Sequence, residues 1–569
     1  MPEQNILQLA LEYHSRGQLN NARTAYLQVL KNIPDQEQVL NNLGALEASL
    51  QNYQLASNYF RKITNISPNK VGGWSSLASA LDLCGDFKGA QLAYLKALDL
   101  DVNNVQILLV YGNFLRRNEK LDEAQDIYRV LLTADPGNKE ALNNLGNIHR
   151  EIGNFENALQ YFEKVVELYG GNDVIYNNIA TTYSDLEDQD KALVFFNLAL
   201  KHNPRHILAL NGKGNALREL CRLDQAIDCF QAAIQIEPTS FISQSNLAGA
   251  IIASSKSDEE KIRQGQNSLK VYLDSQRNLS ERSFPIFALK HHLEQAQYLY
   301  RNQIDVPGLE RFIDVGQELM QRFPLEEGSI FVGHEIYSIM REYLGSYVEY
   351  EIPNSIRYGL NPKNEWKKIE QQYFDSDEAI YIDNFLSEEA LEALYKYCLI
   401  SKVWTREYPK CYLGAFGYQG FISKLHLKIA NEIRELMPNI FKEYRLSHLW
   451  AFKYDAKLGS GINVHADPAR VNINFWLTPD EFNLEEGRGG LIVYGKKAKA
   501  EWDFHTYNNN ADKIYNYISN DVNNCTNVPY KRNRCVLFNS VLFHETDKID
   551  FSDVYEGRRI NMTYLFGNK

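Results

Sequence analysis

His465 and Asp467 form the one His-x-Asp triplet of the 569-residue chain, within the segment GINVHADPARVNINFW. Alternate side chains of an extended segment point the same way, so an imidazole and a carboxylate at this spacing can bind one metal ion. Because the chain has 12 histidines, one such triplet is expected by chance about once. The surrounding sequence must therefore decide whether the triplet belongs to a metal site.

A third metal ligand and an anion-binding residue are available on later predicted strands. His544 ends the run NRCVLFNSVLFHE, whose apolar and β-branched content is typical of strands. Two imidazoles and one carboxylate on one face of the metal are the ligands of non-haem Fe(II) sites. In the last predicted strand, RRINMTYLFG, Arg559, Asn561 and Thr563 share one face. An arginine there can pair with a carboxylate through two parallel hydrogen bonds.

This combination resembles the 2-oxoglutarate- and Fe(II)-dependent dioxygenases, close to the prolyl-hydroxylase-like branch, over residues 370–569. The resemblance implies a double-stranded β-helix, or jelly roll, with flanking helices. It implies that His465, Asp467 and His544 bind Fe(II), and that 2-oxoglutarate and O2 are co-substrates. The retained carboxylate of Asp467 favours hydroxylation over halogenation.

The resemblance also predicts how 2-oxoglutarate is held. Arg559 is expected to bind its distal carboxylate, and Arg558 is the alternative if the strand register shifts by one residue. Tyr454, Asn472 and Asn474 stand where the family often has polar residues that face the co-substrate. Hydrogen bonding that only supports the fold is the competing interpretation of these three residues.

Residues 495–531 form an unusually long connection for this fold. A segment of this length is either a lid over the substrate or a flexible insertion, and the sequence leaves both open. His505 within it is interpreted as a solvent-exposed loop residue. The 15 residues from His544 to Arg559 are also a longer gap than compact members have.

The first part of the chain is an internal repeat. Alanine recurs with a spacing of 34 residues, an aromatic residue follows each alanine by four, and a glycine or alanine precedes it by twelve. Small residues let two antiparallel helices approach closely while the aromatic ring fills the space beside them. This pattern resembles the tetratricopeptide repeat and predicts an all-α superhelix over residues 1–256. The recurring alanines are Ala22, Ala56, Ala90, Ala124, Ala158, Ala192 and Ala226.

Four asparagines occupy one position of the first helices, which in such superhelices line a concave groove: Asn42, Asn144, Asn178 and Asn246. An amide both donates and accepts, so a row of them can bind the backbone of an extended peptide. A similar ladder occurs in the repeat domain of the protein O-linked N-acetylglucosamine transferases. The alternative is that these residues cap helices or tie neighbouring repeats together.

Between the repeats and the strand-rich part, residues 257–369 are expected to form a helical connector or linker without chemistry of its own. The domain from residue 370 opens with a strand, a turn and a helix that Ser387 is placed to cap. The chain is thus expected to be multidomain, with boundaries at 1–256, 257–369 and 370–569.

Composition narrows the function classes. A net charge of −12 and a pI of about 5.6 disfavour nucleic acid or an anionic membrane surface as partner. No apolar run is long enough for a membrane-spanning helix, and no signal peptide is expected. The seven cysteines are scattered without a C-x-x-C pair, which favours reduced thiols and a cytoplasmic location.

Taken together, the patterns predict a dioxygenase that hydroxylates a peptide or protein held by the repeat groove. One alternative is an oxygenase of small molecules or natural products whose repeats serve assembly. The other is a non-catalytic repeat scaffold or sensor.

Overall fold

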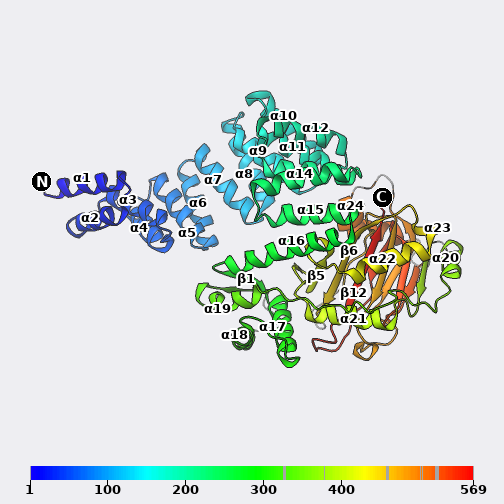
Figure 1. Cartoon of the computed structure of the whole chain (residues 1–569). Helices are drawn as coiled ribbons and strands as arrows, with labels where there is room; N and C mark the ends of the chain where they lie inside the picture. Colours follow the sequence, from blue (N-terminus) through cyan, green and yellow to red (C-terminus); the bar gives the residue numbers. More distant parts are fainter. Residues whose placement is uncertain are drawn as a thin grey trace. The chain divides into compact units, whose positions relative to one another are not determined.

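The computed structural model describes residues 2–323, 328–376, 378–455, 461–499, 502, 504–519 and 525–567, without the side chains of 2, 3, 504, 505 and 509. Its contacts divide the chain into two compact units, Met1–Thr182 and Tyr183–Lys569. Figure 1 shows both and labels most of their helices and some of their strands.

The first unit consists of antiparallel helix pairs that follow the 34-residue period. The small residue of each first helix faces the aromatic ring of the second: a Cβ built on Gly146 would lie 2.4 Å from Cε1 of Phe162. The predicted helical repeats are confirmed. The helices are α1 (Pro2–Ser15), α2 (Leu19–Asn32), α3 (Glu37–Ser49), α4 (Tyr53–Ile66), α5 (Val71–Leu83), α6 (Phe87–Leu100), α7 (Val105–Arg117), α8 (Leu121–Ala134), α9 (Lys139–Glu151), α10 (Phe155–Tyr169) and α11 (Asp173–Asp185), the last of which runs into the second unit.

This close approach predicts opposite effects for two Gly→Ala changes in the first unit. Gly146→Ala forces a methyl group into the Phe162 ring and is expected to lower the free energy of unfolding by about 1–3 kcal/mol. Gly72→Ala, in α5, meets nothing within 4 Å and is expected to be neutral or stabilising by up to about 1 kcal/mol. Urea unfolding followed by circular dichroism measures both. Equal effects would contradict the packing argument.

The helical part of the second unit begins with α12 (Gln189–His202), α13 (Ile207–Glu219), α14 (Leu223–Ile236) and α15 (Phe241–Ala253), which continue the repeats. The 21-residue α16 (Asp258–Asn278) then breaks the period. The expected connector contains α17 (Ile286–Arg301), α18 (Leu309–Arg322) and α19 (His334–Leu344), but also an antiparallel pair of strands that we did not predict. These are β1 (Arg282–Pro285) and β2 (Ser329–Val332), each only four residues long.

Two antiparallel sheets follow. The seven-stranded sheet has the order β3-β10-β7-β12-β6-β5-β4 and the three-stranded sheet the order β11-β8-β9. The strands are β3 (Ala379–Ile382), β4 (Arg406–Tyr408), β5 (Tyr412–Phe416), β6 (Leu446–Tyr454), β7 (Val471–Trp476), β8 (Leu491–Lys497), β9 (Cys525–Val528), β10 (Cys535–Asn539), β11 (Leu542–Thr546) and β12 (Ile560–Phe566).

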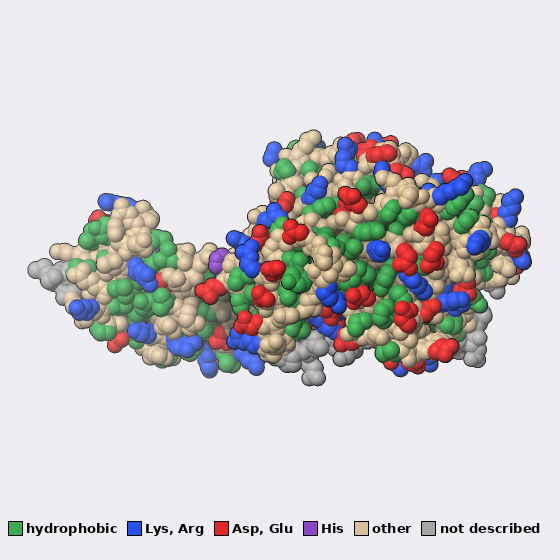
Figure 2. Space-filling model, turned by 60° about the horizontal axis from the view of Figure 1, so that its bottom comes forward, with side chains coloured by type: hydrophobic (Ala, Val, Ile, Leu, Met, Phe, Trp, Pro, Cys, Tyr) green, Lys and Arg blue, Asp and Glu red, His purple; other side chains and the backbone are tan. Residues whose placement is uncertain are grey.

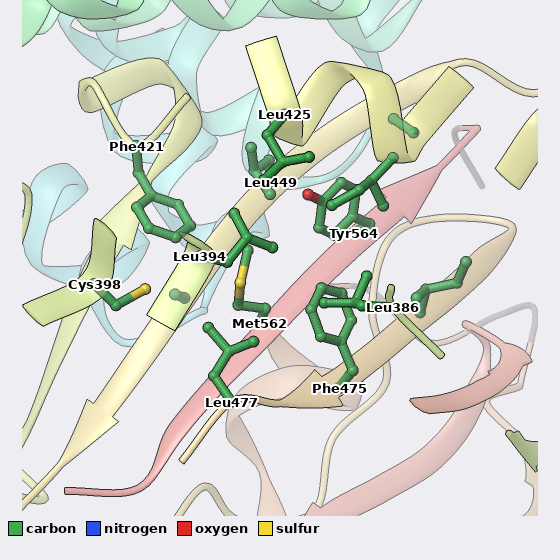
Figure 3. Close-up of a cluster of buried hydrophobic side chains, with 14 of the residues drawn as sticks. Leu386, Leu394, Cys398, Phe421, Leu425, Leu449, Phe475, Leu477, Met562 and Tyr564 are labelled. Atoms are coloured by element: carbon green, nitrogen blue, oxygen red, sulfur yellow. The ribbon is translucent and has the colours of Figure 1, made fainter. Parts of the chain in front are cut away.

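Helices cover one face of the seven-stranded sheet. They are α20 (Trp366–Asp375), α21 (Glu388–Ile400), α22 (Lys424–Leu436) and α23 (Pro438–Phe441). As predicted, Ser387 Oγ accepts a hydrogen bond from the backbone N–H of Ala390 and so caps α21. Figure 3 shows the core between helices and sheet, to which α21 contributes Leu394 and Cys398, α22 Leu425, β6 Leu449, β7 Phe475, and β12 Met562 and Tyr564.

Side-chain alternation directs the other residues of β6, β7 and β12 toward the three-stranded sheet. Phe452, Tyr454 and Trp476 pack there against Leu491 and Val493 of β8. The space between the two sheets is therefore bounded by the face of β7 and β12 that carries their asparagines. We refer to it as the inter-sheet space.

Lys453 points the opposite way, into the helix-covered core, and is 1% exposed. Its Nζ donates to the Cys398 carbonyl at 2.9 Å and to the Tyr555 hydroxyl at 3.1 Å. It also lies 4.7 Å and 4.4 Å from the ring centres of Trp404 and Tyr555. Burial lowers the pKa of this lysine from 10.5 to about 7.

This pKa predicts a pH-dependent contribution to stability. Between about pH 7 and 10.5 the unfolded chain binds a proton at Lys453 that the folded chain does not. The free energy of unfolding therefore rises with pH in this range, because burying Lys453 costs less once the amine is neutral. The unfolding midpoint of the wild type is expected to rise more from pH 7 to 9 than that of Lys453→Met. Thermal unfolding at both pH values measures the difference. Parallel pH profiles would contradict the prediction.

Candidate metal centre

Three side chains converge at one end of the inter-sheet space. One ligand atom each from His465, Asp467 and His544 lies within 4.8 Å of the other two. Nε2 of His465 is 3.7 Å from Asp467 Oδ1, and Nε2 of His544 is 3.4 Å from Asp467 Oδ2. The three residues that the sequence singled out are thus brought together.

The backbone holds the two histidines side by side. The N–H of His465 donates to the carbonyl of His544 at 3.0 Å, and the N–H of His544 donates back at 2.8 Å. This antiparallel bridge joins the segment before β7 to β11. It places the two imidazole ring centres 4.3 Å apart.

The orientation of the rings suits a cation. Nδ1 of His465 is 2.8 Å from the carbonyl of Asn463, and Nδ1 of His544 is 3.1 Å from the carbonyl of Leu542. A carbonyl only accepts, so each Nδ1 donates to it and each Nε2 faces Asp467. A metal ion among these three groups could take Nε2 of both rings and a carboxylate oxygen as ligands.

The electrostatics agree with this arrangement. Burial and the charge of His544 together lower the pKa of His465 to about 4, although the charge of Asp467 opposes them. Burial alone would raise the pKa of Asp467, but the hydrogen bond and charge of His544 and the charge of His465 bring it below its ordinary value. At neutral pH the site therefore offers a neutral His465 and an ionised carboxylate, the forms that bind metal.

The asparagines of β7 continue the site. Asn472 Nδ2 donates to Asp467 Oδ2 at 2.6 Å, which orients the carboxylate. Asn474 Nδ2 donates to Thr563 Oγ1 at 3.2 Å. The Oδ1 atoms of Asn472, Asn474 and Asn561 are buried and accept no hydrogen bond from the described residues. Buried polar atoms without partners are rare, and these three stand on the same sheet face as Arg559.

Arg559 lies at the far end of the same face, just before β12, and is 1% exposed. Its Nε and Nη2 donate to the carbonyls of Gly489 and Gly490 at 2.7 and 3.2 Å. The guanidinium lies 5.1 Å and 5.6 Å from the ring centres of Tyr454 and Trp476.

The guanidinium of Arg559 has no acidic side chain in direct contact among the described residues, although the charge of Asp547 acts on it. It forms no ion pair with an acidic side chain in the described part of the chain, and its Nη1 and Trp476 Nε1 have no hydrogen-bond partner there. An unpaired buried charge costs several kcal/mol. This end of the inter-sheet space therefore fits an anionic group.

Arg558 points the other way, away from the inter-sheet space. It pairs with Glu294 of α17 at 2.7 Å and with Asp455 at 3.1 Å. Lys290 joins the same cluster, 3.3 Å from Asp455. Of the two arginines, Arg559 thus lies on the face that carries the asparagines of β7. Arg558 lies on the other face, where its ion pair with Glu294 holds α17 against the sheet.

The described part of the 495–531 insertion packs behind the triad. Helices α24 (Phe504–Asn509) and α25 (Ala511–Ile518) contribute Tyr507, Ile514 and Ile518 to a cluster with Val464, Ala466 and Phe543. The N–H of Ala466 donates to the carbonyl of Tyr507 at 3.1 Å. Val464 and Ala466 alternate with the ligands His465 and Asp467, so these helices lie on the side of the segment away from the ligands. Residues 500, 501, 503 and 520–524 and the side chain of His505 lie outside the described residues.

The groove asparagines connect neighbouring repeats. Asn144 Nδ2 donates to Asn113 at 2.8 Å, Asn178 Nδ2 to Asn143 at 2.9 Å, and Asn246 Nδ2 to Asn211 at 3.0 Å. Asn42 Nδ2 donates to the Tyr26 hydroxyl at 3.4 Å. Asn144 Nδ2 also donates to the Tyr128 hydroxyl at 3.1 Å. These bonds agree with the role of tying neighbouring repeats together, and peptide binding by this row stays a prediction.

The comparisons agree with the repeat pattern. Tetratricopeptide repeat family models match residues 37–70, 79–139, 139–205 and 207–240. The N-terminal part of the chain is therefore a tetratricopeptide repeat array. No curated protein matches the chain.

Solved structures of repeat proteins are similar to parts of it. A tetratricopeptide repeat protein from Parabacteroides merdae ATCC 43184 is 13% identical, with 43% of this chain and 97% of that one covered, at a TM-score of 0.37. PilF of Pseudomonas aeruginosa is 21% identical, with 37% and 95% covered and a TM-score of 0.32. YrrB, described as a TPR protein with an unusual peptide-binding site, is 22% identical, with 32% and 95% covered and a TM-score of 0.28.

Surface charge and hydropathy add two observations. On the face drawn in Figure 2, Lys and Arg side chains are interspersed with Asp and Glu and form no broad basic area. Among the described residues, no helix combines the length and apolar character needed to cross a membrane.

Several contributors to the site were not predicted. The carbonyls of Asn463 and Leu542, which set the imidazole tautomers, carry no sequence signal because every residue has a carbonyl. Trp476 lies two residues beyond Asn474, on the same face of β7, so strand alternation could have added it to the list. Asn561 is predicted on the same face as Arg559, and its Oδ1 is one of the three asparagine oxygens that accept no hydrogen bond from the described residues.

Proposed function

We propose that residues 370–569 form a jelly-roll dioxygenase that uses Fe(II), 2-oxoglutarate and O2 to hydroxylate a peptide or protein substrate. One observation carries the proposal. A His-Asp-His triad and a buried guanidinium that forms no ion pair with the described residues lie on one inter-sheet space, with asparagine oxygens that accept no hydrogen bond there. This is the arrangement that a metal and a dicarboxylate together require.

The three ligands and Asn472 would have separate roles at the metal. His465, Asp467 and His544 would hold Fe(II), and their placement on one side leaves the opposite side open for ligands. Bound Fe(II) and 2-oxoglutarate together supply the activation of O2 and the oxidation of a substrate C–H bond. Asn472 keeps the carboxylate of Asp467 turned toward the imidazoles through the 2.6 Å hydrogen bond.

Arg559 would bind the distal carboxylate of 2-oxoglutarate. Its Nη1 is free to donate, and Trp476 Nε1 is available beside it. Tyr454 and Trp476 flank the guanidinium and exclude water from it, which strengthens a charge-assisted hydrogen bond. Asn474 faces the middle of the space, where the co-substrate would pass.

The repeats support a peptide or protein as substrate. Arrays of this kind present extended concave surfaces that bind other chains. The array would collect the substrate, and the oxygenase domain would modify one of its residues.

The test is the formation of succinate from 2-oxoglutarate in the presence of Fe(II) and O2, with and without pooled peptides. We expect iron-dependent turnover in the wild type and none in His465→Ala. Absence of iron-dependent turnover under all conditions would refute an oxygenase. Stimulation by small metabolites alone, unchanged when residues 1–182 are deleted, would contradict the peptide substrate.

A further inference from the structure

A cavity of about 570 Å³ lies within the second unit, beside the metal centre. One wall is made by the repeat helices α13 and α15, which contribute Arg218, Phe241 and Asn246. The other wall comes from residues 406–449, including the 3-10 turn Gly417–Gln419 and the start of β6. The volume falls within the range of about 300–1,000 Å³ typical of ligand sites.

The cavity borders the triad. Pro468, which lines it, follows the ligand Asp467 directly in the chain. His448, also in the lining, is lowered in pKa to about 4 by burial and by the charge of Arg218, while the charge of Asp467 opposes this. The charges of the repeat residue Arg218 and of the metal ligand Asp467 thus both act on His448.

The lining combines arginines with aromatic surface. Arg406 and Arg445 are exposed and form no ion pair in the described part of the chain, and Arg218 lies 3.5 Å from Glu219. Phe241, Tyr418 and Tyr444 provide the rings. The lining also contains Glu219 and Glu443. The guanidinium groups of Arg406 and Arg445, which form no ion pair in the described part of the chain, can bind carboxylates in a planar, bidentate geometry.

We propose that this cavity binds a substrate peptide through its acidic side chains, with carboxylates at Arg406 and, separately, at Arg445 and its apolar part against Phe241 and Tyr418. The inference rests on the proposed function, since it names the segment next to the residue that is oxidised. A peptide fits better than a free metabolite because repeat helices form one wall and Asn246 stands there at a groove position of the array.

Binding can be measured without catalysis. Metal-free protein in EDTA is mixed with two labelled hexapeptide pools that differ only in Glu and Asp against Gln and Asn, and retained peptides are quantified by mass spectrometry. We expect the wild type to retain the acidic pool at least tenfold more than the amide pool. Arg406→Gln and Arg445→Gln should each reduce the preference, and the double variant should lose it.

Arg205→Gln is the matched control, because Arg205 is exposed in the same unit and does not line the cavity. It removes the same charge and should retain the wild-type preference. Equal retention of both pools, no effect of the two cavity substitutions, or equally tight binding of free glutamate would overturn the inference. Acidic peptides that bind to a protein without any iron-dependent turnover would refute the oxygenase and leave the binding site standing.

Discussion

Substituting alanine for His465, Asp467 or His544 is expected to weaken binding of Fe(II) or Co(II) more than about 100-fold and to abolish succinate formation. Each change removes one of three ligand atoms that lie within 4.8 Å of one another. Loss of a residue that only orients a ligand typically costs 10–100-fold in metal affinity, so loss of the ligand itself should cost more. Anaerobic titration calorimetry with Fe(II), or the absorption spectrum of bound Co(II), measures affinity independently of turnover.

Two further variants calibrate this result. His334→Ala removes an exposed histidine outside the triad and should bind metal as the wild type does. Asn472→Leu removes the hydrogen bond to Asp467 and should fall between the two, weakened by about 10–100-fold. Triad variants that still bind one equivalent of metal with wild-type affinity would show that these residues do not form the metal site.

The adjacent arginines Arg558 and Arg559 should give opposite phenotypes. Arg559→Met removes the proposed carboxylate ligand but leaves an apolar side chain of similar length in an aromatic setting, so 2-oxoglutarate binding should fall at least about 100-fold while the fold persists. Arg558→Met leaves Glu294 and Asp455 without their arginine. Breaking such a buried ion pair should destabilise the second unit by about 3–5 kcal/mol.

Two measurements separate these effects. Thermal unfolding reports stability, and titration of 2-oxoglutarate into the metal-loaded protein reports affinity at a temperature where both variants are folded. Reduced 2-oxoglutarate affinity in Arg558→Met with a normal Arg559→Met would place the co-substrate on the other side of the strand. Equal loss of affinity in both variants would mean that the strand's position, rather than either guanidinium, decides binding.

The features carried by spacing alone could be predicted from the sequence. The 34-residue period specified the helix pairs, because each small residue must meet an aromatic ring in the next helix, as Gly146 meets Phe162. Alternation placed Arg559, Asn561 and Thr563 on one strand face. The ligand set could be predicted because a His-x-Asp pair and a later strand-borne histidine are visible as residue types.

What the sequence could not supply depends on tertiary contact. The choice between Arg558 and Arg559 was left open because it depends on which of the two side chains faces α17, whose Glu294 is 264 residues from Arg558 in the sequence. The Asn-rich insertion gave no sign of Tyr507, Ile514 and Ile518 packing against Val464 and Ala466. The ribbon of β1 and β2 was missed because strands of four residues carry too short a pattern to recognise.

The backbone bridge between His465 and His544 couples metal affinity to local opening of the fold. Their N–H groups donate to each other's carbonyls, so β11 cannot separate from the segment before β7 without pulling the imidazoles apart. The free energy of metal binding to both imidazoles is then added to the free energy needed to open the backbone bridge between His465 and His544. Hydrogen exchange at the amides of His465 and His544 should therefore slow on metal binding, by a factor set by the metal concentration and its dissociation constant. Exchange at these amides would measure how much of the site holds metal.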